Sequence, residues 1–195
     1  MNPAVSQEIL QLLLKNANLP RRYDFLMLET CRRHEGWANA FDRLWANVSS
    51  KVAGNVVVLC GARGTGKTQM AAELIRFLAI GHQFFCRYEV FQDYLDKLRQ
   101  SWHTADDHAS LFQSPRLVVI DEVAKSGDSA WAEQRLFHLV NSRYNDLKHT
   151  VLITAAAPDQ LNDILSPSVA DRVNEGGAVI HLNWPSFRSH QPKNP

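Results

Sequence analysis

The chain has 195 residues, of which 45% are hydrophobic and 21% are charged, and its formal net charge at pH 7 is +1. This composition excludes a disordered chain and predicts one globular domain with a hydrophobic core and at most a short appendage. Because the charge is close to neutral, no overall basic field favours nucleic acid, and any such binding would require a local basic patch.

The sequence also shows no pattern typical of secretion or of membrane insertion. The three cysteines, Cys31, Cys60 and Cys86, lack paired metal-ligand spacing, and we expect Cys60 and Cys86 to be buried thiols of a reducing compartment. Glu8 and Gln11 interrupt the first apolar stretch, so we expect no signal peptide, and no apolar run is long enough to cross a bilayer. We therefore expect a cytoplasmic protein without a membrane partner.

Hydrophobic periodicity predicts three helical segments before the first strand. The first covers residues 6–16, with Ser6 as its N-cap, and the others cover 24–34 and 36–48. We expect residues 1–50 to form an N-terminal helical segment, residues 51–188 to form the core, and residues 189–195 to be a disordered tail.

Strands and helices alternate over the core. Strands are predicted at 55–60, 83–89, 116–120, 150–155 and 178–183. Helices are predicted at 67–80, 90–102, 129–146 and 158–165, with a polar loop at 103–115. This alternation indicates an α/β fold in which helices cover both faces of a five-stranded parallel sheet, and such sheets bind ligands at the carboxyl ends of their strands.

A phosphate-binding motif follows the first strand. In "GARGTGKT", residues 61–68, the glycines permit positive φ angles that turn backbone N–H groups toward phosphate oxygens. Lys67 would neutralise the terminal phosphates of ATP, and the Thr68 hydroxyl would ligate Mg²⁺. A glycine-rich turn that binds nothing would not need this strand-loop-helix setting. The predicted nucleotide-binding residues are Gly61, Ala62, Arg63, Gly64, Thr65, Gly66, Lys67, Thr68 and Gln69.

Two carboxylates and one arginine complete the predicted catalytic set. Asp121 and Glu122 end the apolar strand in "RLVVIDEV", residues 116–123. We expect Asp121 to hold Mg²⁺ through its water shell and Glu122 to polarise the attacking water, rather than both merely ending a strand at the surface. Arg172, in "SPSVADRV", would by itself be interpreted as a surface side chain, but its place before the last strand allows it to reach a neighbouring subunit's phosphates.

Together these motifs resemble the helicase-loader and transposition-helper ATPases of the DnaC/IstB group, within the AAA+ class. The likeness extends from about Leu19 to Arg188, through "NLPRRY", "GARGTGKT", "LVVIDEV", "LVNSRYND", "VLIT", "SVADRV" and "LNWPSFR". It implies a P-loop core of the RecA-like type and an ATPase that uses ATP or ADP with Mg²⁺. It also implies self-association into a nucleotide-dependent oligomer, single-stranded DNA, and a replicative helicase or a transposase as partners. By position, the resemblance makes Arg172 the arginine finger and places residues 19–23 near the adenine.

The sequence departs from this family at three places. The family usually has an asparagine after Thr154 to orient the attacking water, whereas this chain has Ala155, Ala156 and Ala157. The chain ends soon after Arg188, so we expect no helical lid or only a minimal one. The first fifty residues are too few for a separate folded partner-binding domain, so the first helix would serve that purpose alone.

Other surfaces of the chain could serve as binding sites. Arginine pairs at 21/22 and 32/33 with interleaved Tyr23, Phe25 and Trp37 could hold a single strand, although packing of the aromatics on the core is an equal alternative. A second candidate for binding a single strand consists of Lys97, Arg99 and Trp102. The loop with His103, Asp106, Asp107 and His108 is interpreted as an acidic surface loop and not as a metal site. Trp131 and Trp184 are expected to be core or interface anchors.

Three functions remain open from the sequence. The first is an ATP-driven helicase loader or transposition helper. The second is a nucleotide-dependent assembly module with little hydrolysis, which fits the missing asparagine. The third is a small-molecule kinase. The sequence shows no acceptor-binding site for such a reaction, and a kinase would not need Glu122 to activate a water molecule.

Overall fold

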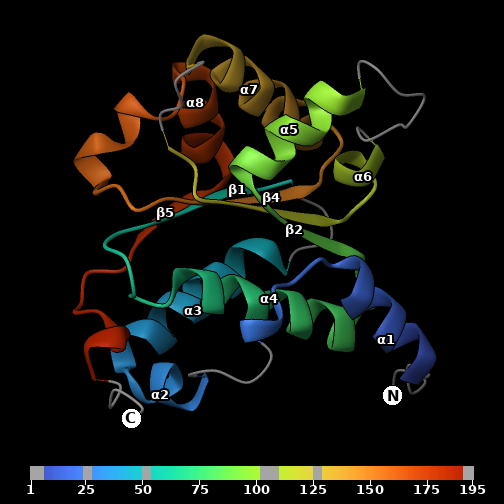
Figure 1. Ribbon diagram of the computed structural model, residues 1–195. Helices are drawn as coiled ribbons and strands as arrows, with labels where there is room; N and C mark the ends of the chain where they lie inside the picture. Colours follow the sequence, from blue (N-terminus) through green and yellow to red (C-terminus); the bar gives the residue numbers. More distant parts are fainter. Residues whose placement is uncertain (1–6, 24–27, 50–53, 102–109, 125–128, 191–195) are drawn as a thin grey trace.

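A five-stranded sheet lies between two layers of helices in the computed structural model, which describes residues 7–23, 28–49, 54–101, 110–124 and 129–190 (Figure 1). The sheet order is β2-β3-β4-β1-β5, and all of its paired strands are parallel. The strands are β1 (Val56–Cys60), β2 (Cys86–Val90), β3 (Leu117–Asp121), β4 (His149–Ile153) and β5 (Ala178–His181). This arrangement confirms the predicted fold class.

The helices divide between the two faces of the sheet (Figure 1). One face carries α1 (Gln7–Asn16), α2 (Leu28–Arg33), α3 (Glu35–Val48) and α4 (Lys67–His82). The other face carries α5 (Phe91–Ser101), α6 (Ser110–Gln113), α7 (Ser129–Asn145) and α8 (Pro167–Gly176). Three short 3₁₀ helices complete the described chain: η1 (Arg21–Tyr23), η2 (Pro158–Asp163) and η3 (Phe187–His190).

Alternating side chains of the interior strand β1 belong to two hydrophobic cores. Val57 and Leu59 pack toward α3 and α4, whereas Val58 packs with the layer of α7 and α8. All five residues of β1 are buried, as expected for a parallel strand covered on both faces. Trp37 and Leu44 of α3 belong to the first core, so the N-terminal helices are part of the same packed structure as the sheet.

Some element boundaries differ from the sequence-based ones. Helix α4 continues to His82 and ends where Gln83 adopts a left-handed φ of 53°, so β2 begins at Cys86 and not at residue 83. The polar loop predicted at 103–115 contains α6, which buries Phe112. The segment expected as a helix at 158–165 forms the 3₁₀ helix η2. Ser6, the predicted N-cap, and residues 191–195 of the predicted tail lie outside the described residues.

The three thiols are buried and free, as expected for Cys60 and Cys86. Burial raises the pKa of Cys31 to about 11 and that of Cys86 to about 12, so both remain protonated at neutral pH. Within the described ranges, none of the helices combines the length and the apolar character that crossing a bilayer requires.

Candidate nucleotide-binding site

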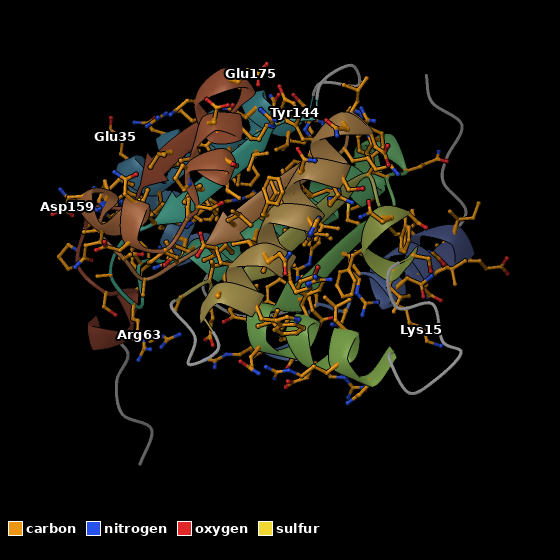
Figure 2. The ribbon with its side chains drawn as sticks, turned by 90° about the horizontal axis from the view of Figure 1, so that it is seen from above. Lys15, Glu35, Arg63, Tyr144, Asp159 and Glu175 are labelled. Atoms are coloured by element: carbon orange, nitrogen blue, oxygen red, sulfur yellow. The ribbon has the colours of Figure 1, made fainter. Side chains whose placement is uncertain are left out.

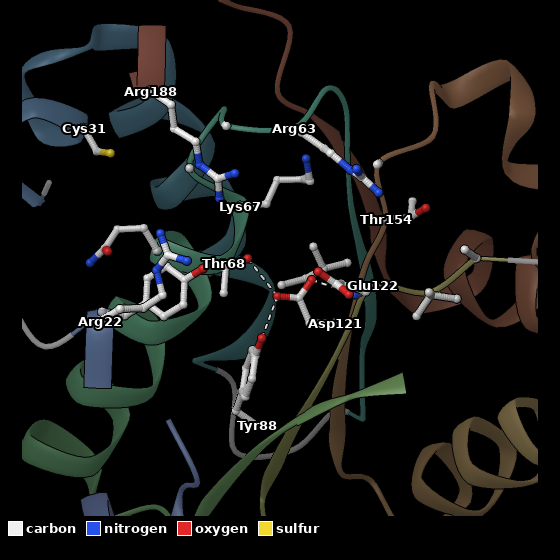
Figure 3. Close-up of a pocket in the computed structure, with 18 residues that line it drawn as sticks. Arg22, Cys31, Arg63, Lys67, Thr68, Tyr88, Asp121, Glu122, Thr154 and Arg188 are labelled. Carbon is white, nitrogen blue, oxygen red and sulfur yellow. Dashed lines mark hydrogen bonds between the residues drawn. The ribbon is translucent and has the colours of Figure 1, made fainter. Parts of the chain in front are cut away.

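A cavity of about 600 Å³ opens at the carboxyl ends of the parallel strands (Figure 3). Its walls come from the loop after β1, from Asp121 and Glu122 at the end of β3, and from Thr154 and Ala155 after β4. Arg188 of η3 also lines it. The parallel topology therefore brings together three motifs that lie far apart in the sequence.

The glycines of the loop are required by both conformation and space. Gly61, Gly64 and Gly66 have φ angles of 124°, 85° and 88°, which other residues rarely adopt. A Cβ atom at Gly64 would lie 1.9 Å from Ser186 Oγ, and one at Gly66 would lie 2.8 Å from Trp37 Nε1. The loop can thus have this shape and these neighbours only with glycine at these positions.

Aromatic residues from two distant segments donate hydrogen bonds to backbone carbonyls of the P-loop. Trp37 Nε1 donates to the carbonyl of Gly66 at 3.3 Å, and Trp184 Nε1 donates to that of Thr65 at 3.1 Å. The backbone N–H of Phe187 donates to the carbonyl of Gly64 at 2.9 Å. Sequence reasoning expected Trp184 only as an anchor; the "NWPSFR" motif was the available signal for this contact, and nothing local marked Trp37.

Lys67 begins α4 and lies inside the loop with 8% of its surface exposed. Its Nζ donates to the carbonyl oxygens of Gly61 at 2.6 Å and Ala62 at 2.7 Å. Burial lowers the pKa of Lys67, while the negative charge of Asp121 opposes that shift. The ammonium is therefore held at the centre of the loop by carbonyl dipoles.

Asp121 is the most constrained acid of the site, with 4% of its surface exposed. Its Oδ2 accepts hydrogen bonds from Thr68 Oγ1 at 2.7 Å and from Tyr88 Oη at 2.8 Å (Figure 3). Its Oδ1 accepts from the backbone N–H of Glu122 at 2.7 Å. Burial and the neighbouring carboxylate raise the pKa of Tyr88, which keeps its hydroxyl a donor.

Glu122 has a backbone conformation unusual for its residue type. Its φ of 58° is left-handed, a region that non-glycine residues enter at some energetic cost. Its side chain is exposed and lines the cavity beside Asp121. The two neighbouring acids therefore have different surroundings, one buried and hydrogen-bonded, the other open to water.

Positive side chains line the cavity opposite the acids. Figure 3 shows Arg22 and Arg188 on one side of the cavity and Asp121 and Glu122 on the other. Arg63, from the loop, also lines the cavity. Arg22 lies in the segment 19–23 that the family resemblance places near the adenine. Arg188 was not assigned to the site, because it comes from a segment distant from the P-loop. The positive charge of the cavity suits a polyphosphate.

The predicted nucleotide-binding residues divide into two groups in the structure. Six of them line the cavity: Arg63, Gly64, Gly66, Lys67, Thr68 and Gln69. Gly61, Ala62 and Thr65 instead form the frame of the loop, with Thr65 fully buried.

The oxygens of Thr68 and Asp121 fit a hydrated Mg²⁺ ion. Both are hard ligands on adjacent elements, and Mg²⁺ keeps several waters and needs few protein ligands. Within the described ranges, no group of three or more His, Cys, Asp or Glu side chains could hold a metal ion. The acidic loop with His103 and Asp106, interpreted above as a surface loop, falls outside those ranges.

Arg172 lies away from the cavity of its own chain. Its guanidinium packs over the ring of Tyr144 at 5.0 Å and lies 3.3 Å from Asp171 Oδ2 and 3.6 Å from Glu175 Oε2. Figure 2 shows Tyr144 and Glu175 at the edge of the molecule opposite Arg63 of the P-loop. Any catalytic use of Arg172 would therefore have to involve the cavity of another protomer.

Several of the cations considered for single-stranded DNA have partners within the chain. Arg32 forms an ion pair with Glu73, and Trp37 is buried, so the core-packing alternative holds for this tryptophan. In the second group, Lys97 pairs with the buried Glu89, and Arg99 lies over the ring of Trp131 at 4.6 Å. Phe25 and Trp102 lie outside the described residues.

Comparison with known proteins agrees with this geometry. Residues 13–194 match the family described as IstB-like ATP binding protein. The replicative helicase loader DnaC of Escherichia coli (strain K12) is 24% identical over 161 residues, which are 80% of this chain and 65% of the loader. The chain thus spans about two thirds of the length of that curated relative.

The same fold occurs in solved structures. A crystal structure of the DnaC helicase loader superimposes with a TM-score of 0.65 at 18% identity, over 86% of this chain and 97% of that one. The replication initiator DnaA bound to AMPPCP and single-stranded DNA gives 0.63 at 20% identity, over 86% and 52%. These matches confirm the AAA+ P-loop fold and the DnaC/IstB resemblance. The chain belongs to the family of IstB-like ATP binding proteins.

Proposed function

We propose that this chain binds and hydrolyses ATP with Mg²⁺ and uses that cycle to assemble a replicative helicase on single-stranded DNA. The observation that carries the proposal is the convergence of Lys67, Thr68, Asp121 and Glu122 on one positively lined cavity. Membership of an ATP-binding family and the similarity to a helicase loader support it.

Each side chain of the site has a distinct part in the proposed reaction. Lys67 would exchange the carbonyls of Gly61 and Ala62 for the β- and γ-phosphates. Thr68 and Asp121 would hold Mg²⁺, which neutralises the phosphate oxygens when bound. Glu122, the exposed acid, would orient the attacking water and accept its proton as the bond between the γ-phosphorus and ADP breaks.

The remaining wall of the cavity is proposed to receive the base. Arg22, Tyr23 and Cys31 line the cavity away from the acids. The family resemblance places residues 19–23 near the adenine. Cys31 is buried with its thiol protonated, so it offers an apolar surface to the base.

Separate measurements of ATP binding and ATP turnover test this assignment. Lys67→Ala removes the charge that faces the phosphates and is expected to weaken ATP binding at least about tenfold. Glu122→Gln keeps the shape of the side chain and is expected to bind ATP as the wild type does, while its turnover falls about 100-fold or more. Both should be measured with and without single-stranded DNA. Normal turnover by Glu122→Gln would refute its assignment as the base.

Two alternatives differ from the loader in partner or in turnover. A transposition helper would share the site but bind a transposase, and a pull-down of a hexameric helicase against one of a transposase distinguishes them. An assembly module with little hydrolysis is favoured by Ala155, which lines the cavity where the family usually has asparagine.

Helix α1, on which Ile9 and Leu12 are 48% and 58% exposed, is the proposed partner-binding element.

A further inference from the structure

We propose that Tyr88 is a positioning residue for the carboxylate of Asp121, an inference that rests on the nucleotide site proposed above. Tyr88 lies on β2, outside every motif that the sequence marks. Its hydroxyl donates at 2.8 Å to Asp121 Oδ2, the same oxygen that accepts from Thr68 Oγ1 at 2.7 Å (Figure 3). The side chain of Asp121 is thus held by one neighbouring strand, β2, and by one helix, α4.

The hydrogen bonds to Asp121 leave one acceptor position on its carboxylate. An ionised carboxylate has about four lone-pair positions, two on each oxygen. Thr68 and Tyr88 use those of Oδ2, and the N–H of Glu122 uses one on Oδ1. One acceptor position, on Oδ1, therefore remains for a water of a bound Mg²⁺ ion, and the three donors would fix the orientation of the carboxylate that offers it.

Water cannot easily replace the Tyr88 hydroxyl. Tyr88 and Asp121 are 5% and 4% exposed, so removal of the hydroxyl leaves a buried oxygen of Asp121 short of one donor. The carboxylate would then be free to rotate about its bond to Cβ. Loss of such a supporting hydrogen bond typically weakens metal binding about 10- to 100-fold.

The backbone of Tyr88 is itself fixed, so its hydroxyl has a defined position. On the outer edge of β2, the Tyr88 N–H donates to the carbonyl of Ala17 at 2.8 Å, and Asn18 Nδ2 donates to the carbonyl of Tyr88 at 3.1 Å. On the inner edge, Tyr88 is in register with Val119 of β3, two residues before Asp121. The N-terminal segment thus covers this edge of the sheet and holds the tyrosine in place.

The test is a Mg²⁺ titration of the binding of a fluorescent ATP analogue, with a parallel measurement in EDTA. Tyr88→Phe removes only the hydroxyl. We expect it to raise the Mg²⁺ concentration at half-maximal binding about tenfold or more, while the affinity in EDTA stays unchanged. A purely structural role would instead weaken binding in both conditions or leave the Mg²⁺ midpoint in place.

Tyr94→Phe is the matched control. Tyr94 is also buried, but its hydroxyl donates to the carbonyl of Arg135 at 3.3 Å, in the other hydrophobic core. Removal of the Tyr94 hydroxyl should leave the Mg²⁺ concentration at half-maximal binding unchanged. A Tyr88→Phe titration that overlays that of the wild type overturns the inference alone. A wild type whose ATP binding does not respond to Mg²⁺ overturns the proposed function and this inference with it.

A double variant covers the case in which Tyr88→Phe does not fold. Asp121→Asn removes the charge that the hydroxyl satisfies. If Tyr88→Phe is unfolded but folds in the Asp121→Asn background, the loss came from the unpaired carboxylate, which supports the inference. If both the Tyr88→Phe single variant and the double variant are unfolded, the hydroxyl matters for packing, and the inference is overturned.

Discussion

Ala155 occupies the position at which one side chain can set the rate of the proposed reaction. It follows Thr154 at the end of β4, is exposed, and lines the cavity. The neighbouring Thr154 Oγ1 accepts from the backbone N–H of Ala156 at 3.3 Å. The methyl group of Ala155 cannot orient a water molecule, whereas the amide of an asparagine can both donate and accept.

Ala155→Asn is therefore expected to increase ATP turnover about tenfold or more, because it supplies the missing contact to the attacking water. ATP affinity should change little. Single-turnover hydrolysis with saturating protein measures the chemical step. Ala157→Asn is the control, since Ala157 lies two residues further along and does not line the cavity. An equal gain from both variants, or none from Ala155→Asn, would contradict the argument.

Whether a site residue could be predicted from the sequence depended on how local its signal was. The loop glycines, Lys67 and Asp121 were predicted because their chemistry is encoded in short motifs next to apolar strands. Tyr88 and Trp37 were missed, since each reaches the site only through the topology of the sheet and its covering helices. Nothing in the neighbouring sequence indicates that either side chain contacts the nucleotide site.

At the scale of elements, Arg143 connects α7 to the amino-terminal ends of strands β3 and β4, at the end of the sheet opposite the cavity. It is fully buried, and its guanidinium donates to the carbonyls of Phe112, Pro115 and His149 at 2.6, 3.0 and 2.6 Å. Its Nε donates to Thr150 Oγ1 at 3.1 Å. Burial lowers the pKa of Arg143, because removal from water disfavours the charged guanidinium. Backbone carbonyl dipoles stabilise the charge that remains.

Arg143→Met should lower the free energy of unfolding by about 3 kcal/mol or more, since it leaves several buried carbonyls without donors. Arg135→Met, on the same helix but half-buried and with its Nη2 donating to the exposed Gln134 at 3.4 Å, should change it by less than about 1 kcal/mol. Denaturant unfolding of both variants without nucleotide measures the difference. ATP affinity of folded Arg143→Met should be unchanged, and similar losses of stability in both variants would refute this role.

The sequence predicted elements better than their ends. All five strands and the long helices were found, because alternation of apolar runs and 3.6-residue periodicity are local signals. The extension of α4 to His82 and the short helix α6 were missed. Both depend on tertiary packing, with Phe112 of α6 buried against Tyr94 at a ring distance of 4.8 Å. The role of "NSRYND" was likewise not evident before Arg143 was seen among its carbonyl partners.

At the scale of the whole molecule, the separation of Arg172 from the cavity predicts that activity depends on assembly. One protomer places its acids and P-loop together but holds Arg172 on a different edge, against Tyr144 and Glu175. If Arg172 stabilises the transferring phosphoryl group, it must do so in the cavity of a neighbouring copy. Each active site would then need the Glu122 of one protomer and the Arg172 of the next.

Mixing two inactive variants tests this dependence. Glu122→Gln and Arg172→Ala should each hydrolyse ATP at about 1% of the wild-type rate or less. An equimolar mixture should recover about a quarter of the wild-type rate, because random assembly pairs an intact Glu122 with an intact Arg172 at about one interface in four. Wild-type turnover by Arg172→Ala alone would refute the assignment. A mixture no more active than the mean of its two components would show that Arg172 does not act across an interface, since only shared sites can be restored by mixing.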